Sequence, residues 1–148
     1  MKAYLDTYVI NIHIFGQYSD IDAKRVAPVK KLFERINAGE IHALISLYAI
    51  QEIYSFCKKV FPGDVGHIAR LALADLFKNE FELTGLLTRE ERLLHRTRFY
   101  LNDQSDQPHV ISAYLNSCDA IITYDEHFKK IKDKIAVYSP DELTSTHS

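Results

Sequence analysis

The chain has 148 residues, of which 47% are hydrophobic, so it is long enough to fold as one domain around a sizeable core. Its formal net charge of −2 excludes nucleic-acid binding through overall positive charge and leaves only a local basic patch for that purpose. Its two cysteines, Cys57 and Cys118, have no CxxC partner, which argues against a zinc site or a disulfide framework and indicates reduced, buried residues of a cytoplasmic protein.

The chain begins directly with a predicted strand over residues 2–5, without the charged region and apolar stretch of a signal peptide. A short helix around 8–12, a polar loop over 16–22 and a helix over 24–37 follow, and Gly39 stops that helix. No apolar run approaches the roughly 20 residues that a membrane helix needs, so we expect no membrane association.

The middle of the chain repeats the order of a strand followed by helices. A strand is predicted over 42–45, and Ser46 is expected to cap a helix that extends to about Lys59. Asp64 is expected to cap the next helix, which reaches about Asn79.

A third predicted strand covers residues 81–83. Thr88 followed by Glu91 forms a capping-box pattern and predicts a helix to about Tyr100. After a polar turn, Asp106 is expected to cap a further helix.

The last part of the chain holds two more predicted strands, over 120–123 and 135–138. The helix that begins at Asp106 ends near Ser117, and the residues from Pro140 are expected to form a frayed turn. Strands that alternate with helices indicate an α/β fold whose parallel sheet is covered on both faces.

Two of the predicted strands, near opposite ends of the chain, each lead into an aspartate, Asp6 and Asp125. The carboxyl ends of parallel strands are where open α/β folds place their ligands. Glu52 lies near the buried side of its helix, where a carboxylate is costly unless it is paired or binds a metal. Asp106 lies at a helix N-terminus, which favours negative charge. Taken singly, each acid is explained as a cap, a turn residue or a solvated side chain, but their joint placement indicates a hard-cation site for phosphate chemistry.

Several segments of the chain resemble the PIN-domain ribonucleases, in particular their VapC-like toxin type. They are Asp6-Thr7, residues 48–53 around Glu52, residues 106–113, residues 118–128 and the closing residues 137–143. The most specific is 118–128, in which an apolar strand leads to a threonine, any residue, an aspartate, two residues and a phenylalanine. The resemblance covers residues 1–143 as a nuclease domain and leaves 144–148 as a C-terminal tail.

The resemblance implies a three-layer α/β/α fold with a central parallel sheet and a divalent-metal-dependent endoribonuclease that uses Mg²⁺ or Mn²⁺. It implies catalytic roles for Asp6, Glu52, Asp106, Asp125 and Thr123. Asp6, Asp106 and Asp125 correspond to metal ligands, Glu52 binds or orients the attacking water, and Thr123 is a hydroxyl beside the last acid. Small stand-alone domains of this family are commonly toxins, so it further implies RNA as substrate, a small antitoxin as partner and a homodimer.

One residue departs from the family pattern, and one acid has a competitor. Tyr8 stands where the family often has Asn or Ser, and a tyrosine is less suited to orient a metal-bound water. Asp103 lies three residues before Asp106, but only Asp106 keeps the expected spacing to His109. His109 itself is interpreted as a core residue.

A basic helix precedes Asp106, and its arginines are candidates for RNA binding. Arg92 and Arg96 are four residues apart and share a helix face, and Arg89 lies close by in sequence. The alternative is a solvated helix in which Glu90 and Glu91 balance the positive charge.

Other classes of protein fit less well. A phosphoaspartyl phosphatase needs a second aspartate where Tyr8 stands, a receiver domain needs an acidic pair after its first strand, and a dinucleotide fold needs glycines before Gly16. The more serious alternative is a non-catalytic PIN-like module that binds RNA or protein. Such a module is expected to have lost one or more acids, and this chain retains all four.

Overall fold

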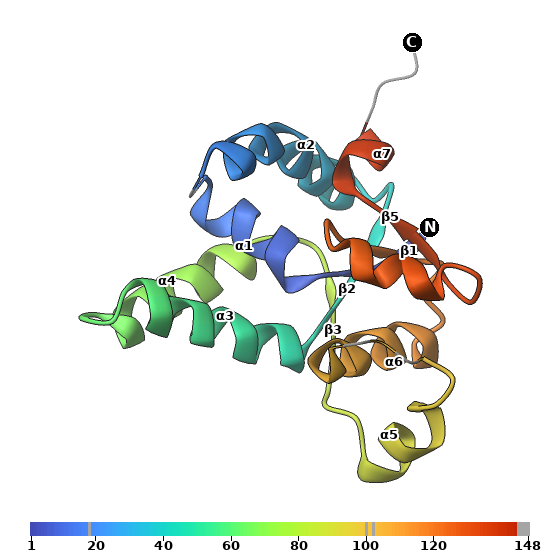
Figure 1. Cartoon of the computed structure of the whole chain (residues 1–148). Helices are drawn as coiled ribbons and strands as arrows, with labels where there is room; N and C mark the ends of the chain where they lie inside the picture. Colours follow the sequence, from blue (N-terminus) through green and yellow to red (C-terminus); the bar gives the residue numbers. More distant parts are fainter. Residues whose placement is uncertain (18, 100, 102, 145–148) are drawn as a thin grey trace.

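The computed structural model describes residues 1–17, 19–99, 101 and 103–144. Within these residues, five parallel strands form one sheet in the order β3-β2-β1-β4-β5, with β1 at its centre (Figure 1). The strands are β1 (Lys2–Leu5), β2 (His42–Ser46), β3 (Glu82–Thr84), β4 (Ala120–Ile122) and β5 (Ala136–Tyr138). All five predicted strands are therefore present, with ends that differ by at most one residue.

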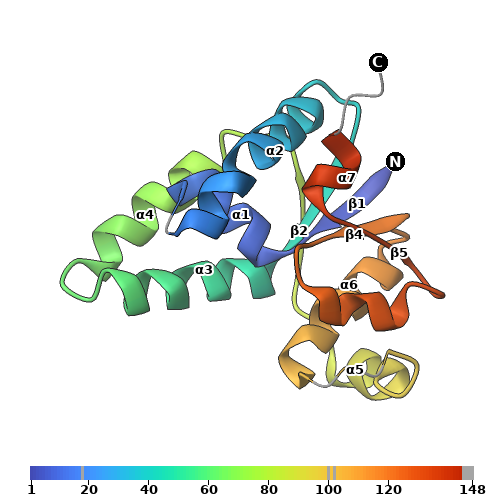
Figure 2. The same cartoon turned by 45° about the horizontal axis from the view of Figure 1, so that its top comes forward.

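Helices cover both faces of this sheet, which confirms the predicted three-layer α/β/α architecture (Figure 2). One face is covered by α1 (Thr7–Phe15), α2 (Asp20–Asn37), α3 (Leu47–Val60), α4 (Val65–Leu76) and α7 (Pro140–Thr144). The other face is covered by α6 (Gln107–Leu115) and the 3₁₀ helix η2 (Glu126–Ile131), with α5 (Arg89–His95) outside α6. None of the described helices combines the length and the apolar character that crossing a bilayer requires.

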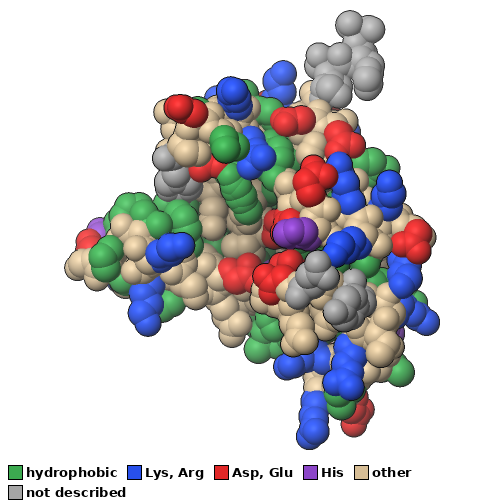
Figure 3. All heavy atoms as spheres, in the orientation of Figure 1, with side chains coloured by type: hydrophobic (Ala, Val, Ile, Leu, Met, Phe, Trp, Pro, Cys, Tyr) green, Lys and Arg blue, Asp and Glu red, His purple; other side chains and the backbone are tan. Residues whose placement is uncertain are grey.

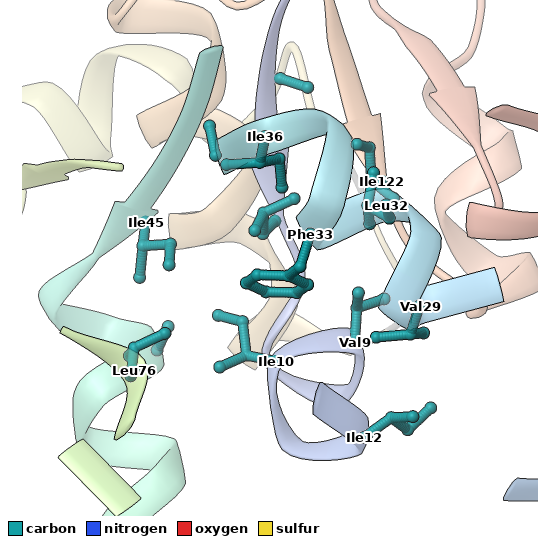
Figure 4. Packing of buried hydrophobic residues seen from close by; sticks show 14 of the residues in the cluster. Val9, Ile10, Ile12, Val29, Leu32, Phe33, Ile36, Ile45, Leu76 and Ile122 are labelled. Atoms are coloured by element: carbon teal, nitrogen blue, oxygen red, sulfur yellow. The ribbon is translucent and has the colours of Figure 1, made fainter. Parts of the chain in front are cut away.

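The alternation of side chains along the strands divides the core into two clusters. In β1, Ala3 and Leu5 face α1 and α2, whereas Tyr4 faces α6. On the first side, Phe33 of α2 lies among aliphatic side chains from α1 and its own helix, including Ile10 and Ile36 (Figure 4). Burying a side chain of this size stabilises the fold by about 1.5–3 kcal/mol. The two clusters together enclose β1 between the helical layers.

Helix α2 begins earlier than predicted. The polar stretch 16–22 was expected to be a loop, yet α2 starts at Asp20, and the Ser19 hydroxyl accepts a hydrogen bond from Asp22 N at 3.2 Å. Acidic residues in the first turn complement the helix dipole, so the polar residues here are a helix start. Helix α1 ends before Gly16, whose φ is 74°.

Residues 140–144 form a helix where a frayed turn was predicted, and the rest of that predicted turn, 145–148, lies outside the described residues. Ser139 and Glu142 form a reciprocal cap, with Glu142 N donating to Ser139 Oγ at 3.2 Å and Ser139 N donating to Glu142 Oε1 at 3.1 Å. Pro140 occupies the first helical position, where a missing N–H costs nothing. The resulting helix α7 packs on α2, and Arg35 of α2 donates a hydrogen bond to the carbonyl of Leu143.

Two other predicted helices are shorter in the structure. Helix α4 ends at Leu76, and the Asp64 side chain makes no capping hydrogen bond. The capping box of α5 is confirmed, with Glu91 N to Thr88 Oγ1 at 3.1 Å and Thr88 N to Glu91 Oε1 at 2.8 Å, but this helix ends at His95. The predicted end near Tyr100 lies outside the described residues.

Candidate active site

The candidate acids gather at the carboxyl edge of the sheet. Asp6 directly follows β1 and Asp125 follows the neighbouring strand β4, so the parallel pairing of the two strands brings these residues to one rim. A cleft of about 730 Å³ opens there and contains Asp6, Asp125 and Glu52 of α3. Its other lining residues are Thr7, Tyr8, Asn11, Ile12, Asp22, Phe56 and Val60. Figure 3 shows acidic side chains gathered near the middle of the corresponding face.

Thr123 links the two strand-terminal aspartates. Its buried hydroxyl donates to Asp6 Oδ2 at 2.7 Å and accepts from Asp125 N at 2.9 Å. The backbone continues the link, because Asp6 N donates to the carbonyl of Ile122 at 3.0 Å. The direction of the Asp6 carboxylate is therefore set by the end of β4 as well as by its own strand.

Asp106 does not cap α6, contrary to the prediction, because its side chain makes no capping hydrogen bond. Asp103 has the capping role instead, for the 3₁₀ turn η1 (Gln104–Asp106), and it accepts from Ser105 N at 2.9 Å and from Ser105 Oγ at 2.6 Å. Burial, together with the negative charges of Asp103, Asp125 and Asp6, raises the pKa of Asp106 to about 6. Asp106 is thus a partly buried carboxyl within electrostatic range of both strand-terminal aspartates.

The carboxyls of Asp6 and Glu52 are shifted in opposite directions. Burial raises the pKa of Asp6, and the hydrogen bond from Thr123 only partly opposes this effect. Burial also acts to raise the pKa of Glu52, but the hydrogen bond and the charge of His109 outweigh it, so the net pKa is lowered. Glu52 therefore ionises more readily than an ordinary glutamate, whereas Asp6 ionises less readily than an ordinary aspartate.

His109 is buried, as expected for a core residue, but its contact with Glu52 was not predicted. Its Nε2 lies 2.5 Å from Glu52 Oε1, and its Nδ1 is hydrogen-bonded to the hydroxyl of Tyr4. The Tyr4 hydroxyl lies 2.6 Å from Ser46 Oγ, the N-cap of α3. The sequence carries no local signal for this contact, because Glu52 and His109 lie 57 positions apart.

Tyr8 lines the cleft, but its hydroxyl is directed toward α2. It donates to the carboxylate of Asp22 and accepts from Arg25 Nη1 at 3.1 Å. The Arg25 guanidinium also lies 4.2 Å from the ring centre of Tyr124, a cation–π arrangement. Tyr8 therefore joins α1 to α2 in a way that the small polar residue of the family pattern does not. Asp22, which the sequence did not indicate as part of the site, enters the cleft lining by this contact.

The three candidate RNA-binding arginines lie outside the acidic cleft, in a neighbouring groove. Arg89, Arg92 and Arg96 line a hollow of about 680 Å³ between α5 and α6. The remaining lining residues are Leu93, Thr97, Gln104, Gln107, Pro108 and Ile111. Basic side chains also gather over α5 at the lower edge of the face in Figure 3. Two of the residues that line this groove, Gln104 and Gln107, lie on either side of Asp106 in the sequence. The groove therefore adjoins the acidic edge.

The acidic edge has the donor chemistry of a Mg²⁺ or Mn²⁺ site. In the described part of the chain, no three acidic, histidine or cysteine side chains converge as a ready-made metal cage. Mg²⁺ does not require one, since it commonly keeps several waters and binds through one or two carboxylates. The charges of Asp103, Asp125 and Asp6 add to burial in raising the pKa of Asp106, so these carboxyls lie near one another. The buried Oδ1 of Asn11, which lines the cleft, has no hydrogen-bond partner among the described residues. Oxygen donors from Asp6, Asp106 and Asp125 therefore fit a hard divalent cation.

Comparison with known proteins identifies the fold of this chain but does not identify its activity. No protein-family model matches the sequence, and no curated protein matches it either. Among solved structures, VapBC2 from Rickettsia felis, bound to a DNA fragment from their promoter, is similar with a TM-score of 0.64 and 15% identity, covering 94% of this chain and 98% of the other. FitAcB from Neisseria gonorrhoeae is similar with a TM-score of 0.63 and 16% identity, covering 93% and 97%. These likenesses confirm the predicted PIN-like α/β fold over nearly the whole chain.

Proposed function

We propose that the protein is a divalent-metal-dependent endoribonuclease and the toxin of a toxin–antitoxin pair. The observation that carries this proposal is that Asp6 and Asp125 line one cleft at the sheet edge, near enough to Asp106 for their charges to add to burial and to Asp103 in raising its pKa. Like charges brought together at a cleft are stable when a cation neutralises them. The chemistry that such a cation supports best is the hydrolysis of an anionic phosphodiester.

Asp6, Asp106 and Asp125 would hold the cation, directly or through water. When bound, Mg²⁺ or Mn²⁺ offsets the phosphodiester charge and lowers the pKa of a coordinated water. Thr123 keeps the Asp6 carboxylate in place through its 2.7 Å hydrogen bond. Glu52, ionised and facing the same cleft, accepts a hydrogen bond from the attacking water and orients it. The family resemblance implies products with a 5′-phosphate and a 3′-hydroxyl.

The test is cleavage of RNA by the purified protein with Mg²⁺ or Mn²⁺ present. We expect Asp6→Asn and Asp125→Asn to lower kcat/KM by about 100-fold or more, because each change removes a charged oxygen donor for the metal. Asp133→Asn, which removes an exposed carboxylate outside the cleft, is the matched control and should leave cleavage unchanged. Equal cleavage by all four proteins would refute the assignment of the acids. A parent protein that neither cleaves RNA nor responds to the cation would instead support the non-catalytic binding module.

A protein partner is part of the proposal. The Rickettsia felis neighbour is described as VapBC2 bound to promoter DNA, and the PIN resemblance implies a small antitoxin that covers the acidic site. We expect a small open reading frame beside the gene whose product co-purifies with this chain and suppresses cleavage. Light scattering of the purified chain measures the expected homodimer. The toxin role would be contradicted if no small open reading frame lies beside the gene and no protein co-purifies with the chain. The nuclease assignment would remain intact.

A further inference from the structure

A chain of three buried polar side chains runs through the core on the α6 side of the sheet. Tyr4 and Ser46 are 0% exposed and His109 is 2% exposed. The Tyr4 hydroxyl lies between the other two, hydrogen-bonded to Ser46 Oγ at 2.6 Å and to His109 Nδ1. The chain ends in the cleft, where His109 Nε2 meets Glu52 Oε1 at 2.5 Å and the Glu52 side chain is 44% exposed.

Packing alone does not account for these polar groups. Tyr4 lies in an apolar cluster with Leu44, Ile121 and Val110, where a phenylalanine ring would fill the same space. Buried polar groups are costly unless all are satisfied, and fully satisfied networks are rigid. The network reaches the surface through the contact of His109 with Glu52. Any effect of its rigidity on function is therefore expected at Glu52 in the cleft.

The Tyr4 hydroxyl satisfies His109 in either charge state of the ring. With a neutral ring, Tyr4 donates to Nδ1 and Ser46 can donate to Tyr4. With a charged ring, Nδ1–H donates to the Tyr4 oxygen and Tyr4 donates to Ser46 Oγ. In both arrangements Nε2 carries a proton and donates to Glu52. Ser46 is itself anchored as the cap of α3, the helix that carries Glu52.

We propose that Tyr4 and His109 are positioning residues that hold the Glu52 carboxylate in the cleft through the hydrogen-bonded chain Ser46–Tyr4–His109. This role rests on the proposed nuclease function. Neither residue touches the RNA or the metal in this role. Tyr4 acts through His109, and His109 acts through Glu52.

The kinetic test begins with Tyr4→Phe, which keeps the ring and removes the hydroxyl. We expect kcat for RNA cleavage to fall about 10-fold, as for other residues that orient a catalytic group, with KM and stabilisation by Mg²⁺ unchanged. Tyr114→Phe is the matched control, because the Tyr114 hydroxyl accepts a hydrogen bond from Arg98 Nη1 at 2.7 Å away from the cleft. An unchanged kcat in a folded Tyr4→Phe protein overturns the proposal.

Substitution of His109 separates positioning from packing. His109→Leu should lower kcat at least as much as Tyr4→Phe, and His109→Gln, which retains an N–H donor for Glu52, should recover part of the loss. Adding Tyr4→Phe to His109→Leu should cause no further loss, because residues that act in series are not additive. Additive losses would show that Tyr4 acts independently of His109 and would overturn the proposed chain. If Tyr4→Phe does not fold, the comparison of His109→Gln with His109→Leu carries the test, and equal losses overturn the proposal.

A spectroscopic measurement tests the chain without reference to activity. In ¹⁵N-labelled parent protein we expect a slowly exchanging proton on His109 Nε2, and in Tyr4→Phe we expect its exchange with water to become at least 10-fold faster. Equal exchange in both proteins would overturn the chain. A parent that does not cleave RNA but shows the protected proton would refute the proposed nuclease function and leave the hydrogen-bonded chain standing.

Discussion

A single hydroxyl joins the two strand-terminal aspartates at the residue scale. Thr123 is buried, and it both donates to Asp6 Oδ2 and accepts from Asp125 N. A threonine supplies this double contact because its hydroxyl is a donor and an acceptor on a stiff β-branched side chain. The threonine two residues before the last acid is therefore explained by geometry as well as by family resemblance.

Thr123→Val keeps the shape of the side chain and removes both hydrogen bonds. We expect the free energy of unfolding to fall by about 1–3 kcal/mol, because the partners at Asp6 and Asp125 lose a buried contact. Cleavage should fall as well, since the Asp6 carboxylate is then free to turn. Urea unfolding measures the first effect, with the exposed Thr97 changed to valine as its control, and RNA cleavage measures the second. A Thr123→Val protein as stable as the parent would show that the hydroxyl is not a structural link.

Asp106 makes folding depend on pH in the metal-free protein. Its pKa is raised from 3.8 to about 6 in the folded state, so folding favours the protonated form. The stability that this preference contributes is complete below about pH 4 and is lost as the pH rises through about 6. Asp106→Asn does not titrate, so we expect its Tm advantage over the parent to increase from pH 4 to pH 7. Thermal unfolding in chelator measures it, and a Tm difference that stays constant over this range contradicts the shift.

At the scale of elements, α5 and α6 form a basic groove beside the acidic edge. Three arginines of the segment 89–96 line it, and the Glu91 side chain is turned back to its own capping box. The alternative of a solvated helix balanced by Glu90 and Glu91 stands beside this interpretation, because Glu91 keeps its charge while it accepts the capping hydrogen bond. The arrangement favours a phosphate-binding surface next to the proposed catalytic centre.

Replacement of Arg92 and Arg96 together by alanine should weaken RNA binding. We expect KM to rise about 10-fold at low salt, with kcat nearly unchanged and a shallower dependence of KM on salt, because phosphate contacts contribute through counterion release. The matched control replaces Lys30 and Lys31 of α2, which are exposed and lie outside the groove. Equal effects of the two double variants would mean that only net charge matters.

At the scale of the whole molecule, the fold is shared with neighbours of 15% and 16% identity. Such divergence is compatible with one architecture because packing requires apolar residues of suitable volume at each position and not specific side chains. Here the centre of the sheet is β1, whose residues pack on both helical layers. The strand that leads into Asp6 is consequently packed on both of its faces.

Binding of Mg²⁺ or Mn²⁺ should stabilise the whole fold. A ligand that binds only the folded state at about 100 times its Kd adds about 2.7 kcal/mol, or roughly 5 to 10 °C in Tm for a domain of this size. We expect this increase in the parent and its loss in Asp6→Asn and Asp125→Asn. Differential scanning fluorimetry with and without the cation measures it, and an equal increase in the Asp6→Asn protein would place the cation elsewhere.

The sequence by itself determined the order of the elements, because short apolar runs and amphipathic helical patterns are local signals. It also placed Asp6 and Asp125 at strand ends, and the rule that parallel strands share a carboxyl edge then predicted that they meet. Local capping rules identify Ser46 and Thr88 correctly. The same capping-box pattern at Ser139 and Glu142 begins α7, where a frayed turn was predicted.

Only the tertiary structure decided how the side chains are paired. The contact of His109 with Glu52 joins residues 57 positions apart, and that of Tyr4 with His109 joins residues 105 positions apart. No local pattern encodes such pairs, because they depend on which face of β1 meets which turn of α6. The same reason explains Tyr8, whose hydroxyl turns toward α2 because a folded partner, Asp22, is there to accept its hydrogen bond.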